Sequence, residues 1–539
     1  AQGGTATALT VNPNPTDVKF IGALDPRLDT GLAPGFVPGI GPVPNACFGA
    51  GVPDNPDGTS LLVCPPYEKP FYENYQWSVN AQLDVDLGFA TLTVLPAYRF
   101  EDLDYLEYGP GYADKQHPKS KQKSIEARLS DRSANLKWVL GAYYFKVDQT
   151  LPTQIRNETN FQNGVVDLAA EVESYAFFGE TTYSLTDNLR IIGGLRYTHE
   201  QSGTSGDLNS VIGPPGVINP ITMLENVQTE AYNPFHPILN PTGELLDYPI
   251  ANETSSSAVT WKAGLEFDVT RSSLLFGTVS RGFKGGGTYV DRPGVDSSFK
   301  PEFLTALEIG SRNRFLDNRL QINVEAFYWK LSDQQIPYVG FNDFGNVTFK
   351  TANAGKANMY GADLDMVFRL TSNDTLRGSV EYLHSEYDTF VRAVPSFSVL
   401  PGTGCVATDN GEILGTPSSL LDCSGQQLLR APKWSGSAGY EHRFDLASGA
   451  FVAANFDMTF ASKRYVSPSY TANVLQPANT VLNAALTYES ANGAIVVSGW
   501  IRNIANERIL AGGEQFVPGY ARLNVQPPRT YGGSVRFNF

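Results

Sequence analysis

Long apolar runs are missing from this chain of 539 residues. No stretch reaches eighteen consecutive apolar residues, whereas a membrane-crossing α-helix needs about 20 of them. The sequence therefore excludes a transmembrane helix. It also shows no signal peptide and no initial Met, because it begins Ala1-Gln2-Gly3-Gly4, and such a start is typical of a mature or cropped product.

Basic residues are outnumbered by acidic ones. The chain has 40 Lys and Arg residues and 55 Asp and Glu residues, a net charge of -15, which argues against a nucleic-acid partner. Met and Trp are scarce, at 4 and 6 residues, whereas Gly, Pro, Tyr and Phe number 51, 35, 26 and 31. This abundance of turn formers and strand-favouring aromatics, without long helical patterns, predicts an all-β protein.

Histidine and cysteine are also scarce, and their spacing does not suit a metal site. The 5 histidines are scattered and no CxxC pair occurs, so we expect no metal site and no cofactor. The 4 cysteines form two close pairs, Cys47 with Cys64 and Cys405 with Cys423, both in loop-like segments. We expect two loop disulfides facing the cell exterior, which fits an oxidising compartment. Four unrelated free thiols are the alternative.

Alternation of apolar and polar side chains begins at Phe71 and continues to the end of the chain. In residues 259–269, one face of a strand would carry Val259, Trp261, Ala263, Leu265, Phe267 and Val269. The same pattern recurs in residues 189–198, 320–330, 362–369, 376–384 and 452–462. About seventeen strand-like runs occur, and many are as long as the roughly 9 to 11 tilted residues that cross a bilayer. We therefore predict a transmembrane antiparallel β-barrel, with a lipid face that includes Trp261, Leu265, Val452, Phe456 and Phe537.

The connections between these runs alternate between short and long. Short ones lie at 185–188, 269–272, 315–318, 371–374, 447–449 and 490–493, and long ones cover about 151–168, 201–254, 284–300, 388–426 and 506–528. Outer-membrane barrels have tight periplasmic turns and long external loops in this order. We assign residues 1–70 to a long extracellular loop region and residues 71–539 to the barrel. Pro96, inside the run 92–100, indicates a bulge or an edge.

A series of short motifs follows in fixed order along the predicted strands. They are TVSRGFKGGG at 278–287, FKPE at 299–302, LEIG at 307–310, ANAGKA at 352–357, YGAD at 360–363, LRAPKW at 429–434, RNI at 502–504 and PRTYG at 528–532. Together they resemble the barrel of TonB-dependent outer-membrane receptors. The triplet 285–287 lacks the Lys-Ser/Thr of a phosphate loop, so we interpret it as a loop that must pack closely. The resemblance covers residues 71–539.

The resemblance implies a barrel of 22 strands filled by an N-terminal plug, which a short TonB-contacting segment precedes. No plug-like segment stands before Phe71, and about seventeen strands is an odd number, while bacterial single-chain barrels are even-stranded. We therefore expect a fragment of a longer receptor, with an open edge and little capacity to close into a barrel alone. A genuine shorter barrel is the alternative.

The chain ends in an alternating strand with an aromatic residue at its carboxyl terminus. Tyr531, Val535, Phe537 and Phe539 share its apolar face. These residues resemble the terminal signal that the outer-membrane assembly machinery reads on its clients. We therefore expect the barrel assembly machinery among the partners of this protein.

By resemblance, the chain is a multi-pass outer-membrane receptor of a Gram-negative bacterium, not an enzyme. It would bind a scarce solute of the ferric siderophore or cobalamin type and import it with TonB-derived energy. The implied partners are the TonB complex, reached through a plug not present in this chain, outer-membrane lipid, and a small-molecule or metal-chelate ligand. Two alternatives remain open, a passive porin and a soluble all-β carbohydrate-binding protein. We expect ligand contacts from the long loops, through Tyr232, Asn233, Tyr289 and Tyr387.

Overall fold

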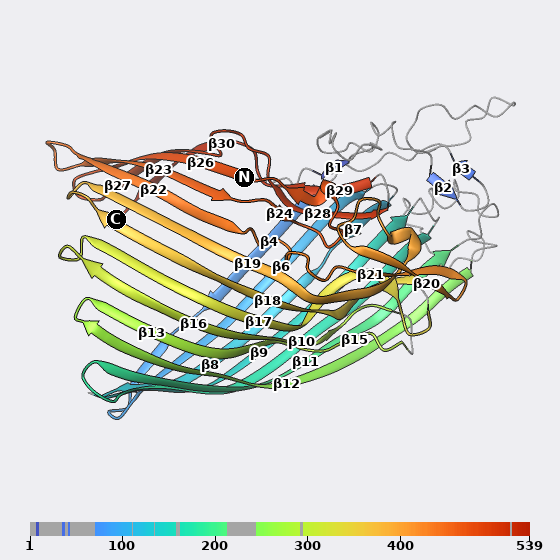
Figure 1. Ribbon diagram of the computed structural model, residues 1–539, viewed down its shortest axis with the longest axis horizontal. Helices are drawn as coiled ribbons and strands as arrows, with labels where there is room; N and C mark the ends of the chain where they lie inside the picture. Colours follow the sequence, from blue (N-terminus) through green and yellow to red (C-terminus); the bar gives the residue numbers. More distant parts are fainter. Residues whose placement is uncertain are drawn as a thin grey trace.

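A single curved wall of long antiparallel strands dominates the computed structural model (Figure 1). The structure describes residues 7–9, 35–37, 41–43, 71–109, 112–133, 135–157, 162–212, 244–291, 295–345, 347–517 and 520–538. Within these ranges, no helix is both long and apolar enough to cross a membrane. The fold is the antiparallel β-barrel that the sequence predicts.

Seventeen strands of the described chain make up the wall, each paired antiparallel with its neighbour. They are β4 (Phe71–Asn80), β6 (Thr91–Gly109), β8 (Lys119–Arg132), β9 (Leu136–Asn157), β10 (Gln162–Ser184), β11 (Leu189–Ile212), β12 (Glu244–Thr270), β13 (Ser273–Lys284), β16 (Glu302–Phe315), β17 (Leu320–Phe341), β18 (Val347–Arg369), β19 (Asp374–Pro395), β22 (Trp434–Asp445), β23 (Phe451–Ala461), β26 (Asn479–Glu489), β27 (Ile495–Arg502) and β30 (Thr530–Phe537). This number agrees with the count of strand-like runs in the sequence.

Shorter segments extend the wall or lie on the side of the long connections. Those that join the wall are β5 (Leu83–Asp86), β7 (Tyr112–Gln116), β20 (Val406–Ile413) and β21 (Thr416–Asp422). The others are β1 (Thr7–Leu9), β2 (Gly35–Val37), β3 (Gly41–Val43), β14 (Gly287–Thr288), β15 (Ser298–Phe299), β24 (Arg464–Tyr465), β25 (Leu475–Gln476), β28 (Leu510–Val517), β29 (Tyr520–Val525) and the short 3-10 helices η3 (Ser396–Ser398) and η4 (Ala472–Val474).

The predicted lipid face points outward. On β12 the exposed side chains are the apolar ones of the predicted face, and the alternate residues from Thr260 to Asp268 are more sheltered. Leu265 is 55% exposed, and Phe456 and Phe537 are similarly open at 44% and 59%. Val452 is half-buried, on the same face of β23 as Phe456. A row of exposed apolar side chains along each strand suits contact with lipid rather than with water.

The wall strands are longer than a bilayer crossing requires, and the additional length lies on one side of the wall. β12 has 27 residues, whereas about 9 to 11 tilted residues cross a membrane. The turns at one end of the wall stay short, as between Ser184 and Leu189 and between Thr270 and Ser273. The additional strand length therefore projects on the side of the long connections, which is the external side of an outer-membrane barrel.

Because the strands project in this way, one predicted long connection is wrong and another is shorter than predicted. Residues 151–168 are not a long loop, because β9 and β10 stay paired up to the register of Asn157 with Gln162. The connection predicted over 201–254 shrinks in the same way, since β11 and β12 remain paired as far as Ile212 and Glu244. Beyond the bilayer a paired strand needs no apolar face, so polar residues continue the ladder without the alternation that marks a wall strand in sequence.

Pro96 interrupts the neighbouring strand, as its lack of an N–H predicts. Asn80 of β4 pairs with Ala97 and Leu83 of β5 pairs with Val94, so the break between β4 and β5 faces Pro96. The Pro96 carbonyl still accepts a hydrogen bond from the Ala81 N–H at 3.1 Å. The irregularity is therefore local, and β4 and β5 together form one strand of the wall.

The first and last strands of the wall form its seam. The strand order closes the sheet by placing β30 next to β4, which differs from the expected open edge. The registers of the described residues, however, pair β4 with β6 and β30 with β27, and none joins β4 to β30. Both strands run from the long connections toward the short turns, so a direct pairing between them would be parallel. Nearly every side chain of β4 is exposed.

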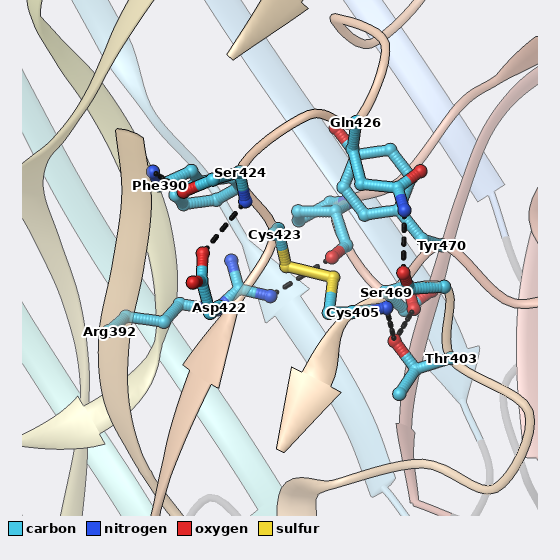
Figure 2. The surroundings of a disulfide bond; sticks show 12 residues. Phe390, Arg392, Thr403, Cys405, Asp422, Cys423, Ser424, Gln426, Ser469 and Tyr470 are labelled. Atoms are coloured by element: carbon cyan, nitrogen blue, oxygen red, sulfur yellow. Dashed lines mark hydrogen bonds between the residues drawn. A yellow bond between two sulfur atoms is a disulfide. The ribbon is translucent and has the colours of Figure 1, made fainter. Parts of the chain in front are cut away.

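A disulfide closes the hairpin of β20 and β21 on the external side (Figure 2). Cys405 and Cys423 flank the last pair of that hairpin, Val406 with Asp422, and their sulfurs are bonded as predicted. Cys423 is completely buried in a cluster with Tyr387, Phe390 and Tyr470. Cys47 and Cys64 lie outside the described residues.

Replacing Leu265 by Arg tests which face of the wall points toward lipid. Near the bilayer midplane, a lipid-facing Arg costs about 2 to 4 kcal/mol, because the charge must leave water. We expect this loss in a reversible folding titration in lipid. Thr260→Arg on the sheltered face of the same strand is the matched control and should lose much less. Equal losses in the two variants would show that the two faces have been assigned wrongly.

Replacing Cys405 and Cys423 by Ala tests the role of the disulfide. In the chain-entropy model, a loop of this size contributes about 3 kcal/mol, and here it constrains the external loop rather than the wall. We expect faster limited proteolysis within residues 396–433 and unchanged heat-modifiable migration of the barrel. Alkylation of either cysteine in the unreduced wild-type protein would contradict the bond itself.

Candidate ligand-binding site

Three of the sequence motifs meet at the external mouth of the barrel. The N–H of Lys300 donates to Oδ1 of Asn353 at 2.7 Å, and Nδ2 of Asn353 donates back to the Lys300 carbonyl at 2.8 Å. Gln335 uses its backbone N–H to bind Oε2 of Glu302 at 2.8 Å and its Nε2 to bind the Gly285 carbonyl at 2.7 Å. These bonds tie the connection between β13 and β16 back to β17 and β18.

The glycine triplet packs closely, in agreement with the structural interpretation. A side chain at Gly285 would collide with the carboxylate of Glu200, and one at Gly287 would collide with the ring of Phe299. The N–H of Gly286 donates to Oγ of Ser256 at 3.0 Å. The backbone can approach the inner wall only because these positions lack Cβ atoms.

An inner-wall cavity of about 920 Å³ lies beside this connection. Aromatic rings and cations line it. The guanidinium carbon of Arg196 lies 5.7 Å from the ring centre of Tyr143 and 5.5 Å from that of Phe178. Glu200, Lys284 and Gln335 also line this cavity. Its size and its mixture of rings and a few polar groups are typical of a small-molecule site.

A second cavity of about 450 Å³, the loop cavity, lies between the end of β19 and the external connections. Its walls include Tyr338, Tyr387, Arg392, Leu421 and Ser469. The cluster around the disulfide supports it, because Tyr387 and Phe390 pack with ring centres 4.7 Å apart. The hydroxyl of Tyr470 donates to the Gln427 carbonyl at 2.7 Å, and burial raises the pKa of Tyr470, so this group remains a neutral donor.

The described residues that were predicted to contact a ligand are buried and do not form an exposed binding face. Tyr387 is only 2% exposed, and its ring belongs to the disulfide cluster. Tyr289 is 9% exposed, and burial beside Asp291 raises the pKa of Tyr289 to about 12. The two are not in one cavity, since only Tyr387 lines the loop cavity. Tyr232 and Asn233 lie outside the described residues.

The terminal residues lie on the outer surface of the wall. Tyr531 is 81% exposed, and Val535 and Phe537 are exposed on the same face of β30. Phe539 lies outside the described residues. The face is apolar and open, as a lipid-facing strand requires.

Arg392 is the functional candidate that sequence reasoning missed. It has 7% of its surface exposed, in a chain whose other cations mostly reach solvent or a carboxylate. Burial lowers the pKa of Arg392, and the nearby Tyr338, Tyr470 and Tyr387 oppose this shift more weakly. Nothing in the alternation of residues 374–395 distinguishes it, because its surroundings come from connections far along the chain. The described part of the chain holds no group of three or more His, Cys, Asp and Glu side chains that could hold a metal ion.

Comparisons with known proteins agree with this architecture. The family model described as TonB dependent receptor-like, beta-barrel matches residues 22–504. A comparison with curated proteins gave no match. The solved structure of the ferric yersiniabactin uptake receptor FyuA from Yersinia pestis is 15% identical with a TM-score of 0.65, over 87% of this chain and 62% of that one. For the siderophore receptor PiuA from Acinetobacter baumannii, the values are 15%, 0.59, 87% and 64%.

The unliganded ferric citrate transporter FecA is also similar, at 14% identity with a TM-score of 0.56, over 87% of this chain and 62% of that one. Identities this low establish the fold alone. The chain spans less than two thirds of the length of each of these three receptors. The match to the family model covers most of the chain, and the protein therefore belongs to the TonB-dependent receptors, a family of transport receptors rather than enzymes.

Proposed function

We propose that this protein is an outer-membrane receptor of a Gram-negative bacterium that binds a scarce metal chelate on the external side and imports it with energy delivered by TonB. The observation that carries the proposal is the external mouth. Two cavities of small-molecule size lie there, on connections that hydrogen bonds and a disulfide hold against the wall. Receptors need such preformed sites to hold a dilute solute while transport occurs.

The chemistry of the mouth favours an organic chelate over a small hydrated ion. Rings such as Tyr143 and Tyr338 give each cavity an apolar surface. Cations give each cavity positive charge, namely Arg196 and Lys284 in the inner-wall cavity and Arg392 and Arg430 in the loop cavity. Siderophore complexes combine organic surface with anionic groups. FyuA, PiuA and FecA are described as receptors or transporters of ferric yersiniabactin, a siderophore and ferric citrate, which supports an iron chelate as the cargo.

Uptake of radiolabelled ferric chelates by cells that express the complete receptor gene tests this function. We expect saturable uptake of at least one chelate at nanomolar concentration, in cells with TonB and not in cells without it. Uptake that is equal in both strains and does not saturate would indicate a passive porin instead.

Replacing residues 213–243 by a short Gly-Ser link tests whether this connection contributes to chelate binding. The structure keeps β11 and β12 paired up to these limits, so the replacement spares the wall. We expect a folded barrel with chelate uptake lost. Unchanged uptake would remove this connection from the binding surface.

We also propose that the assembly machinery recognises β30. The strand must find a partner in the membrane, because each unpaired backbone group in hydrocarbon costs several kcal/mol. Phe537 lies on its open apolar face, whereas Ser534 lies on the opposite one.

Phe537→Asp should therefore reduce the heat-modifiable barrel in outer-membrane fractions by about tenfold or more, which corresponds to roughly 1.4 kcal/mol. Ser534→Asp introduces the same charge on the other face and should have a small effect. Equal amounts of folded barrel from the two variants would contradict a signal on the apolar face.

A further inference from the structure

Arg392 is buried where no carboxylate meets it. Its Nη2 donates to the Pro468 carbonyl at 2.9 Å, but its Nε and Nη1 have no hydrogen-bond partner. A guanidinium keeps its charge in proteins and carries five N–H donors in a rigid fork. Burying a charge without a partner is costly, and natural proteins rarely do so without a reason. Most donors of Arg392 therefore lack an acceptor within the described part of the chain.

Aromatic rings offset part of this cost. The guanidinium carbon lies 4.8 Å from the ring centre of Phe390 and 5.6 Å from that of Tyr338. Cation–π contacts stabilise a buried guanidinium but do not satisfy its N–H groups. The rings thus hold the cation in place, and Nε and Nη1 of Arg392 remain without an acceptor.

The side chain of Arg392 belongs to the wall of the loop cavity. Arg392 lines this cavity of about 450 Å³ together with apolar side chains, among them Val394, Leu400 and Val466. A second unpaired polar atom, Oε1 of Gln334, lies on a side chain that lines the same cavity. Unpaired polar atoms on two side chains that line one cavity indicate a ligand that brings its own acceptors and donors.

We propose that Arg392 binds a carboxylate that is carried on a flat apolar or aromatic part of the ligand. A carboxylate matches the guanidinium fork with two parallel hydrogen bonds. The apolar walls then contact the body to which the carboxylate is attached, which a free phosphate ion lacks. This subsite rests on the proposed function only in taking the ligand to be part of the imported solute.

The surroundings of Arg392 are fixed before any ligand arrives (Figure 2). Its neighbour Phe390 accepts a hydrogen bond from the Cys423 N–H at 2.8 Å and donates its own N–H to Oγ of Ser424 at 3.0 Å. Val391 lies opposite Asp422 in the ladder between β19 and β21. The disulfide at Cys423 holds this ladder, so little conformational freedom is lost when a carboxylate binds.

The test is the binding of 4-fluorobenzoate to the refolded protein in uncharged detergent, followed by fluorine NMR relaxation. The neutral isostere 4-fluorobenzamide and inorganic phosphate are the comparison probes. We expect 4-fluorobenzoate to bind, 4-fluorobenzamide to bind at least tenfold more weakly, and phosphate not to displace the benzoate. Arg392→Gln should weaken benzoate binding by about ten- to a hundredfold, since a hydrogen bond to a charged group is lost.

Arg443→Gln is the matched control. The guanidinium carbon of Arg443 also lies over a ring, 3.9 Å from the centre of Phe451, but Arg443 is paired with Asp445 at 2.7 Å. This variant should bind benzoate as the wild-type protein does. If Arg392→Gln does not fold, Arg392→Lys keeps the charge without the fork and should bind benzoate with intermediate affinity.

Three results would overturn the proposal. They are equal binding of benzoate and benzamide, displacement of benzoate by phosphate at equal concentration, and full benzoate affinity in a folded Arg392 variant. The outcome is separate from that of the proposed function, because uptake independent of TonB would leave this titration unchanged.

Discussion

Backbone hydrogen bonding in a solvent without water is the constraint on which this structure depends. Within hydrocarbon every N–H and C=O group needs a partner in the protein, and a laddered sheet supplies one on each side of each strand. This requirement explains the continuous series of ladders from β4 to β30, in which bulges shift the register only locally. It also explains why Pro96 disturbs only the neighbouring strand, where the break between β4 and β5 keeps a hydrogen bond to the Pro96 carbonyl. At the seam, the closed strand order meets the same requirement by placing β30 next to β4.

Outside the bilayer the constraint relaxes, and the protein builds a second kind of structure there. The wall is one layer thick, so it has few completely buried side chains. The largest fully buried side chains all lie in the external connections and strand ends, namely Tyr387, Tyr470, Phe390, Leu523, Val474, Pro395, Cys423 and Ser418. Water drives this burial, whereas lipid does not. The mouth of the barrel is therefore the part that folds like a soluble domain, and its cavities follow from that packing.

The sequence predicts the wall well because the alternation of apolar and polar residues within each wall strand indicates which face is exposed to lipid. Residues 259–269 alternate strictly, and the exposure of Val259 and Leu265 follows the pattern. The disulfide was predictable for a similar reason, since Cys405 and Cys423 are only 18 residues apart. The mouth was not, because its contacts join segments far apart in sequence. Tyr387 was expected in an open loop, yet it packs against a cluster that includes Tyr470.

The same reasoning explains why a single cation can matter in so acidic a protein. A net charge of -15 repels anions at long range, but salt screens that repulsion beyond about 8 to 10 Å. A buried guanidinium acts only at short range and in a medium of low polarity, where its hydrogen bonds are strong. To reach Arg392, an anion must leave water, and its own desolvation opposes binding unless an apolar body is buried with it. A hydrated inorganic ion gains little from the rings and aliphatic side chains of the loop cavity, whereas an organic carboxylate gains from both the charge and the walls. Burial of the cation therefore makes the site selective for the part of the ligand that carries the charge.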